Sequence, residues 1–254
     1  MRAIEKIKCI VSYDGTRYKG FQRQQDVITI QGEIERALAT IHKKSVTIHA
    51  SGRTDAGVHA VGQVFHFESF LNLPVERWQM AINSLLPKDI HIRRVEKVDP
   101  SFHARYSAKA KEYRYYINRG EYQPLKENYC YQRRSPVPLV VDRMKQAIKL
   151  FEGTHDFLPF TVKNEVENTV RTIYRADLIE HGDFLELIFI GSGFLRCQVR
   201  VMVGTLIEIG EGVRDIATIQ RLLQGENEPA GRTAPPQGLY LYRVFYEDAD
   251  TFLG

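Results

Sequence analysis

The feature that most restricts the fold of this chain is an order of periodic segments that occurs twice. In the first half, an alternating strand-like segment is followed by a segment with apolar side chains at helical spacing, then by two strands, a helix and a strand. This is the β-α-β-β-α-β order of a ferredoxin-like unit. The strands are predicted at 4–13, 46–51, 62–68 and 89–98, and the helices at 30–44 and at 74–86, the latter opened by Pro74.

The second half has the same order once one additional helix, at 215–224, is set aside. Strands are predicted at 108–118, 167–179, 183–191 and 239–246, and helices at 139–152 and 195–209. We therefore predict an α+β protein with a half at 1–101 and a half at 102–254, joined near Asp99-Pro100-Ser101. Two such sheets can join edge to edge into one continuous mixed, mainly antiparallel sheet with a central cleft. The stretch 225–238, which is rich in Gly and Pro, predicts a loop.

Periodicity also selects the side chains that should form the core. Ile7, Cys9, Val11 and Tyr13 share one face of the first strand, and Trp78, Ile82 and Leu85 share one face of the second helix. In the second half Tyr113, Tyr115 and Ile117 should point to the same side of their strand.

The composition is that of an ordinary folded protein, with 43% hydrophobic residues. No apolar run approaches the roughly 20 residues of a membrane span, and the first residues resemble a strand rather than a signal peptide. The three cysteines are few and far apart, which favours reduced thiols and a cytoplasmic location.

The formal net charge of +4 is modest, but the cations occur in clusters. Aromatic residues accompany several of them, and cations with exposed rings are what RNA binding requires. Solvated strands with salt-bridged side chains would give the same pattern, so charge alone leaves both interpretations open. The clusters are Lys109 with Lys111 and Arg114, Arg93 with Arg94, Arg133 with Arg134, and Arg196 with Arg200.

One short segment, Ser51 to His59, is a candidate for chemistry. It lies between two predicted strands, and Gly52 and Gly57 indicate a tight loop that presents Asp55 from rigid supports. Arg53 can contact phosphate or help to keep the carboxylate charged. The alternative is that Asp55 merely makes a local turn or cap.

Other chemistries have weaker support. The sequence has no phosphate-binding P-loop, dinucleotide fingerprint, zinc-ligand spacing or serine-hydrolase elbow. Gly191-Ser192-Gly193 precedes a predicted helix and could bind an anion, although a plain turn is the simpler interpretation. His49, His59 and His66 could approach one another across neighbouring strands.

Several blocks along nearly the whole chain resemble the tRNA pseudouridine synthase A family. The most specific is Gly52-Arg53-Thr54-Asp55-Ala56-Gly57-Val58-His59, followed by Gly62-Gln63-Val64. The others are Tyr13-Asp14-Gly15-Thr16, Gly20-Phe21-Gln22-Arg23-Gln24, Gln31-Gly32, Phe102-His103-Ala104-Arg105-Tyr106-Ser107-Ala108, Lys111-Glu112-Tyr113-Arg114-Tyr115, Phe194-Leu195-Arg196, Val199-Arg200-Val201-Met202-Val203-Gly204 and Ala234-Pro235-Pro236-Gln237-Gly238-Leu239-Tyr240-Leu241.

The resemblance implies a pseudouridine synthase fold and an isomerase that converts uridine to pseudouridine at positions 38, 39 and 40 of the tRNA anticodon stem-loop. It implies a homodimer that needs no cofactor and no metal. Asp55 resembles the family's catalytic aspartate, Tyr113 the tyrosine that stacks on the target base, Arg200 the basic partner of the aspartate and Arg53 the arginine linked with opening the base.

The reaction breaks the C1′–N1 bond, turns the uracil over and rejoins it through C5. A carboxylate beside the ribose can attack C1′ or remove the C2′ proton, and the sequence leaves both routes open. It also leaves open a non-catalytic RNA-binding relative, a hydrolase that releases uracil, and an isomerase acting at another RNA site.

Overall fold

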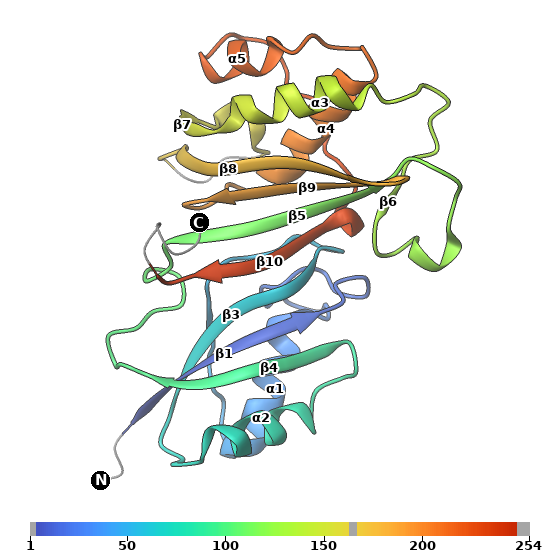
Figure 1. The fold of residues 1–254 in the computed structure, drawn as a ribbon. Helices are drawn as coiled ribbons and strands as arrows, with labels where there is room; N and C mark the ends of the chain where they lie inside the picture. Colours follow the sequence, from blue (N-terminus) through green and yellow to red (C-terminus); the bar gives the residue numbers. More distant parts are fainter. Residues whose placement is uncertain (1–3, 163–166, 248–254) are drawn as a thin grey trace. The chain divides into compact units, whose positions relative to one another are not determined.

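The computed structural model describes residues 4–162 and 167–247, which fall into two compact units. Unit 1 contains the chain up to Lys109 together with Leu241–Glu247, and unit 2 contains Ala110–Tyr240. Both units combine helices with a mainly antiparallel sheet (Figure 1), which confirms the predicted α+β class. None of the helices in the described ranges has the length and apolar character that crossing a bilayer requires.

Unit 1 has the predicted β-α-β-β-α-β order. Its sheet has the strand order β4-β1-β3-β10, where β10 is Leu239–Phe245, and β1 pairs antiparallel with both β3 and β4. Helix α1 crosses behind these strands in Figure 1, and α2 lies beside it. The elements are β1 (Glu5–Tyr13), α1 (Ile30–His42), β2 (His49–Ala50), β3 (His59–Ser69), α2 (Val75–Asn83) and β4 (Ile90–Val98).

Local sequence signals explain the borders of α1. The Thr29 side chain accepts a hydrogen bond from the backbone N–H of Gly32 at 3.2 Å, as an N-cap should. Lys43 ends the helix in the left-handed conformation, with φ at 56°.

Two details of unit 1 differ from the expectation. The strand predicted at 46–51 is reduced to His49–Ala50. Leu85 is 41% exposed rather than buried, because α2 ends at Asn83 and the following turn carries Leu85 away from the face that holds Trp78 and Ile82.

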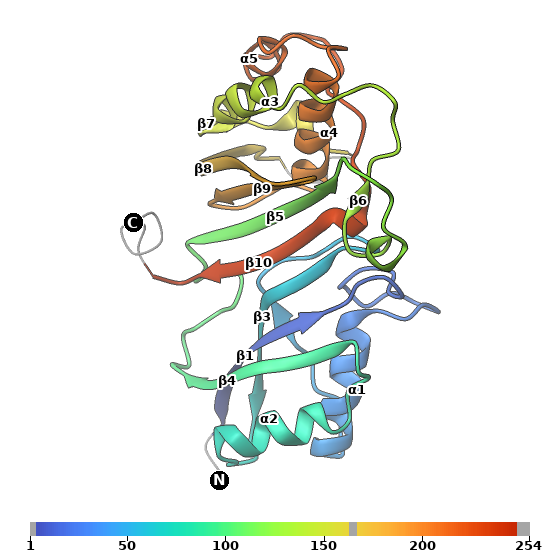
Figure 2. The same cartoon turned by 45° about the vertical axis from the view of Figure 1, so that its right-hand side comes forward.

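Unit 2 contains the predicted elements and two further short strands. Its sheet has the order β5-β9-β8-β7, and α3 packs against α4 and β8 (Figure 2). The elements are β5 (Ala110–Asn118), β6 (Tyr131–Gln132), α3 (Val141–Ile148), β7 (Gly153–Asp156), β8 (Val170–His181), β9 (Phe184–Gly191), α4 (Gln198–Gly210), α5 (Thr218–Leu223) and β10 (Leu239–Phe245), the last of which continues into unit 1 at Leu241.

The unexpected strands are β6, which runs parallel to β5, and β7, which pairs with β8. At two and four residues they are too short to show a period of two in the sequence. The second-half core is as predicted: Tyr113, Tyr115 and Ile117 are all buried on β5.

Candidate functional site

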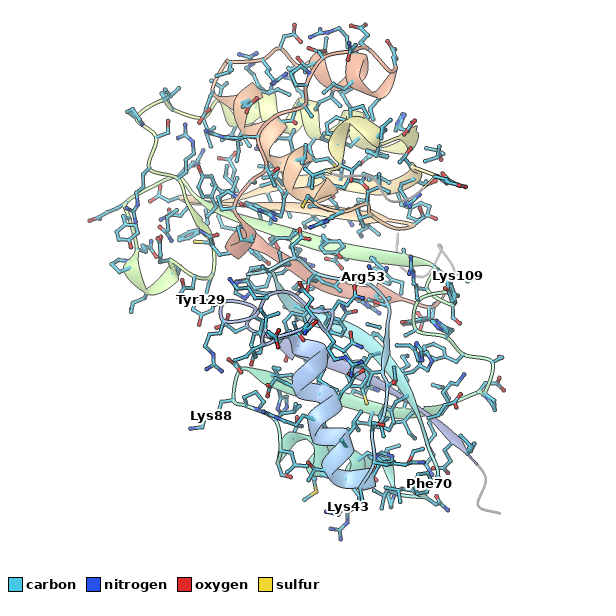
Figure 3. All side chains as sticks on the ribbon, turned by 180° about the vertical axis from the view of Figure 1, so that it is seen from behind. Lys43, Arg53, Phe70, Lys88, Lys109 and Tyr129 are labelled. Carbon is cyan, nitrogen blue, oxygen red and sulfur yellow. The ribbon has the colours of Figure 1, made fainter. Side chains whose placement is uncertain are left out.

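Asp55 lies on the loop that connects β2 to β3 in unit 1. The loop is short and irregular, and Gly57 has a φ of +77°, which only glycine adopts at low cost. Asp55 itself is half-buried, and Arg53, which is labelled in Figure 3, is exposed. The two residues therefore lie on one loop, as the sequence predicted.

Thr54, the residue before the aspartate, is held by hydrogen bonds at both its backbone and its side chain. The carbonyl of Thr54 accepts a hydrogen bond from the Phe21 N–H at 3.1 Å. Its hydroxyl is hydrogen-bonded to the Tyr13 hydroxyl at 2.8 Å, and both side chains are buried. Burial raises the pKa of Tyr13, so the phenol remains a neutral partner. The position of Asp55 along the loop is thus set by the end of β1 and by Phe21.

Two glycines let the chain segment after β1 pack directly on this loop. A Cβ at Gly15 would overlap the Val58 carbonyl oxygen. Gly20 has a φ of +92°, and a Cβ there would lie 2.9 Å from the Thr54 carbonyl oxygen. Side chains at these positions would push the loop away, so both glycines help to define where Asp55 lies.

The start of the loop is held by a glutamine on β3. Gln63 Nε2 donates to the Gly52 carbonyl at 2.9 Å, and Gln63 Oε1 accepts from the Ser51 hydroxyl at 2.7 Å. At the far end His59 Nδ1 accepts from the Gly15 N–H at 3.1 Å. The Asp55 loop is therefore anchored at each end as well as beside the aspartate.

Tyr113 and Arg200 belong to unit 2 and are placed by regular elements. Tyr113 lies on β5, opposite Phe189 of β9, and is 8% exposed. Its ring meets the ring of Phe194 edge to face, with centroids 5.1 Å apart. Phe194 belongs to a block that the resemblance included, but the sequence indicated no role for it.

Arg200 is half-buried on α4, and its backbone and side chain both contact the loop at 231–236. Its Nε donates to the Ala234 carbonyl at 2.7 Å, and its carbonyl accepts from the Ala234 N–H at 3.0 Å. Gly204 permits this approach, because a Cβ there would overlap the Arg232 carbonyl. An arginine on an apolar helix thus has a structural partner in addition to any catalytic one.

The basic clusters divide into paired and exposed members. Arg114 lies 2.6 Å from Glu112 and 2.8 Å from Glu186, and the buried Arg133 is paired with Glu211 at 2.9 Å. Such arginines stabilise the fold, as the salt-bridge interpretation of the sequence required. The exposed cations that can meet phosphate include Lys109, Arg53 and Arg196.

The structure also answers two further possibilities raised by the sequence, a cluster of three histidines and an anion site at Gly191–Gly193. His49 stacks on His66, but His59 lies with Gly15, away from that pair. Residues 4–162 and 167–247 contain no group of three or more His, Cys, Asp or Glu side chains that could hold a metal ion. Helix α4 begins at Gln198, beyond Gly191–Gly193, so that glycine segment is the end of β9 with the bend that follows it and not a helix N-terminus.

Comparison with known proteins identifies the family. A family model described as tRNA pseudouridine synthase matches residues 9–107 and 147–247. This chain belongs to the tRNA pseudouridine synthase family. A tRNA pseudouridine synthase A of Geobacillus sp. (strain WCH70) is 50% identical over 248 residues, which are 96% of this chain and 99% of that protein. The protein of the same name from Exiguobacterium sp. (strain ATCC BAA-1283 / AT1b) is 50% identical over 249 residues, covering 97% and 100%.

Likeness to solved structures is weaker. A Cbf5–Nop10–Gar1 complex contains a chain with a TM-score of 0.35 and 12% identity, covering 95% of this tRNA pseudouridine synthase family member and 60% of that chain.

Sequence reasoning missed the residues that hold the Asp55 loop in place. Tyr13, Gly20 and Gln63 belong to blocks that carried the family resemblance, yet their contacts with Thr54 and Gly52 join positions far apart in the sequence. Periodicity within one strand cannot reveal such contacts.

Proposed function

We propose that this chain isomerises uridine to pseudouridine at positions 38, 39 and 40 in the anticodon stem-loop of tRNA, with Asp55 as the catalytic carboxylate. The observation that carries the proposal is that Asp55 is half-buried on a loop whose neighbouring residue is fixed by Phe21 and Tyr13. A carboxylate that must meet one ribose carbon needs this kind of rigid support. Family membership supports the same reaction.

The carboxylate can serve in two ways. It can attack C1′ as uracil departs, or it can remove the C2′ proton, and in both cases the base is turned over and rejoined through C5. The net change is an isomerisation, so no atom is gained or lost. The tRNA stays intact, whereas a hydrolase would leave an abasic site and free uracil.

We infer roles for three further residues. Tyr113 faces the target base, with its ring available for stacking and its phenol for proton transfer at C5. Arg53, exposed on the same loop as Asp55, contacts phosphate or fills the space left by the flipped nucleotide. Arg200 acts as the basic partner of the aspartate.

We also propose that the protein is a cytoplasmic homodimer, which analytical ultracentrifugation of the protein and fractionation of cells can test.

The decisive experiment replaces Asp55 by Asn and measures pseudouridine formation in an unmodified tRNA transcript. We expect turnover to fall by about 10³-fold or more while tRNA binding is kept, because the amide can neither attack C1′ nor accept a proton. Asp26→Asn is the matched control, since Asp26 is an exposed aspartate on a neighbouring loop with a φ of 58°, which Asn tolerates.

Three outcomes would count against the proposal. Full activity of Asp55→Asn would remove the role of this residue. Free uracil as product would indicate a hydrolase, and pseudouridine mapped only outside positions 38–40 would assign another RNA site.

A further inference from the structure

Unit 1 contains a second feature, a pocket of about 510 Å³ that is separate from the Asp55 loop. It is formed by the first residues of β1, the segment after α1, β2, the end of β3 and the loop that follows Pro100. We call it the histidine pocket. Its lining residues are Ile4, Lys6, Lys44, Ser45, Val46, Thr47, His49, His66, Glu68, Ser69, Phe70 and His103.

One wall of the histidine pocket is made of imidazole rings. His49 stacks on His66 with centroids 5.1 Å apart, and His103 lies 4.7 Å from His66 and 5.6 Å from His49. Tyr106, which is 77% exposed, extends the row at 4.4 Å from His103. Protein rings arranged in this way are the surfaces on which unstacked RNA bases rest.

His66 and His103 do not carry the charge of the pocket at neutral pH. Burial lowers the pKa of His66 to about 4, and His103 and His49 add to this effect. Burial and the neighbouring His49 and Lys6 lower the pKa of His103 as well. The imidazoles of His66 and His103 are therefore neutral stacking surfaces rather than phosphate partners.

Metal binding does not explain the cluster. His66 Nδ1 already accepts a hydrogen bond from the Ala104 N–H at 3.1 Å, and the His66 ring is also hydrogen-bonded to the backbone of His49. Within residues 4–162 and 167–247 no set of three such side chains has a geometry that could hold a metal ion.

The positive charge of the pocket comes from two lysines. Lys6 is anchored by hydrogen bonds to the carbonyls of Pro100 and Phe102. Lys44 is exposed, its ammonium lies 4.1 Å from the centroid of the Phe70 ring, and the described ranges contain no ion pair to it. Glu68, the one acidic residue in the lining, is 63% exposed and 3.9 Å from Lys6. The two lysines and Glu68 thus give the opening of the pocket a net positive charge beside the aromatic rings.

The polypeptide connects the pocket to the Asp55 loop. His49 is on β2, whose next residues lead into the loop, and it precedes Asp55 by six positions. Six residues span at most about 20 Å. An RNA strand with its reactive nucleotide at Asp55 can therefore reach the pocket within a few nucleotides.

We propose that the histidine pocket is a second tRNA-binding site, in which Lys44 contacts a backbone phosphate and the His49–His103 wall stacks on an unpaired base near the target uridine. The inference rests on the proposed function, because it assumes a tRNA substrate. It assigns RNA contacts to residues that lie outside the Asp55 loop.

The charge contact is tested with Lys44→Gln, using an unmodified tRNA transcript and equilibrium binding at several salt concentrations. Loss of one phosphate contact on an unpaired strand should raise Kd about five- to tenfold near 0.1 M salt and reduce the slope of log K against log salt by about 0.7. Lys43→Gln is the matched control, because Lys43 is the adjacent lysine and extends outward from the carboxyl end of α1 (Figure 3) without lining the pocket. Equal Kd values for the two variants would overturn the proposal.

The stacking contact is tested with His49→Ala, with His91→Ala as a control for an exposed histidine elsewhere in unit 1. We expect Kd to rise about tenfold for His49→Ala with an unchanged salt slope, since the lost contact is not ionic. A change in oligomeric state with unchanged RNA affinity would assign the pocket to a second copy of the chain and refute the RNA site. Both readouts measure binding, so an active Asp55→Asn variant would refute the proposed function without altering them.

Discussion

The two units hold their candidate functional groups by different means. In unit 1 an irregular loop places Asp55, and its shape depends on close backbone contacts and on buried hydrogen bonds from Tyr13 and Gln63. In unit 2 Tyr113 and Arg200 project from β5 and α4. A substitution that changes the path of the loop in unit 1 should therefore impair catalysis from a distance, whereas in unit 2 the effects should be confined to the substituted side chain.

The largest effect that tests this comparison should come from Tyr113→Phe. Removal of the phenol oxygen leaves the ring contact with Phe194 in place but removes a proton-transfer group, so kcat should fall about 10²- to 10⁴-fold. Tyr116→Phe is the control on the same strand, since its hydroxyl donates to Glu186 at 3.0 Å. Single-turnover pseudouridine assays would measure both, and full activity of Tyr113→Phe would leave only a stacking role for Tyr113.

The next effect should come from Gly20→Ala, which acts through the position of the Asp55 loop and not through a proposed catalytic side chain. The new Cβ would lie 2.9 Å from the Thr54 carbonyl in a backbone conformation that disfavours alanine, and a displacement of about 1 Å at Asp55 can cost about 10²-fold in kcat. Gly182→Ala introduces a comparable backbone strain, at φ +62°, with no atom within 4 Å of the Cβ. If both variants lost activity equally, strain or unfolding rather than movement of the loop would be the cause.

A smaller effect is expected for Tyr13→Phe, which removes the hydrogen bond to Thr54. We expect a loss of about 1 kcal/mol in the free energy of unfolding and about a tenfold loss in kcat. Tyr18→Phe should cost as much stability or more, because its hydroxyl donates to the Asp89 carboxylate at 2.6 Å, yet should leave kcat unchanged. Denaturant titration together with kinetics separates the two effects.

Much of the fold could be predicted from sequence because long elements carry a clear period. The alternation in β1 and the helical spacing in α1 and α4 were sufficient to give the order of elements in each half. The strands β6 and β7 were missed because they are defined by pairing with distant strands and not by their own sequence. Leu85 was assigned to the core because periodicity does not mark the residue at which a helix stops.

For the candidate site, the sequence locates the loop residues but not the contacts that position them. Asp55 and Arg53 could be located because glycines and charged residues are concentrated in one short segment. The roles of Gly15 and Gly20 could not, because the need for glycine there arises from the Val58 and Thr54 carbonyls, which belong to another loop. The same is true of Arg200, whose contact with Ala234 depends on the packing of a loop against α4.

The units should also respond differently to acid. In unit 1 burial lowers the pKa of His66 to about 4, and it lowers the pKa of His42 too. In unit 2 burial opposes the charge of Glu186, but hydrogen bonds from His181, Arg114 and Tyr116 outweigh it and lower the pKa of this carboxyl. Protonation of a buried histidine and protonation of a hydrogen-bonded carboxylate therefore destabilise the folded state over different ranges of pH.

The smallest effect on stability at neutral pH is expected for His66→Asn, and this effect should become measurable in acid. Because the folded-state pKa of His66 is below its unfolded value of 6.5, its contribution to stability is complete above pH 6.5 and is lost as the pH falls towards 4; at pH 5 the loss is about 2 kcal/mol. Asparagine can still accept from the Ala104 N–H but cannot be protonated. The variant should therefore lose less stability than the parent between pH 7 and pH 5, measured by denaturant unfolding.

Glu186→Gln, the control in unit 2, should alter the pH dependence only below about 4.5, where the carboxyl of the unfolded chain takes up its proton. Identical curves for His66→Asn and the parent above pH 5 would mean that the acid sensitivity of unit 1 originates elsewhere, with His42 as the next histidine to replace.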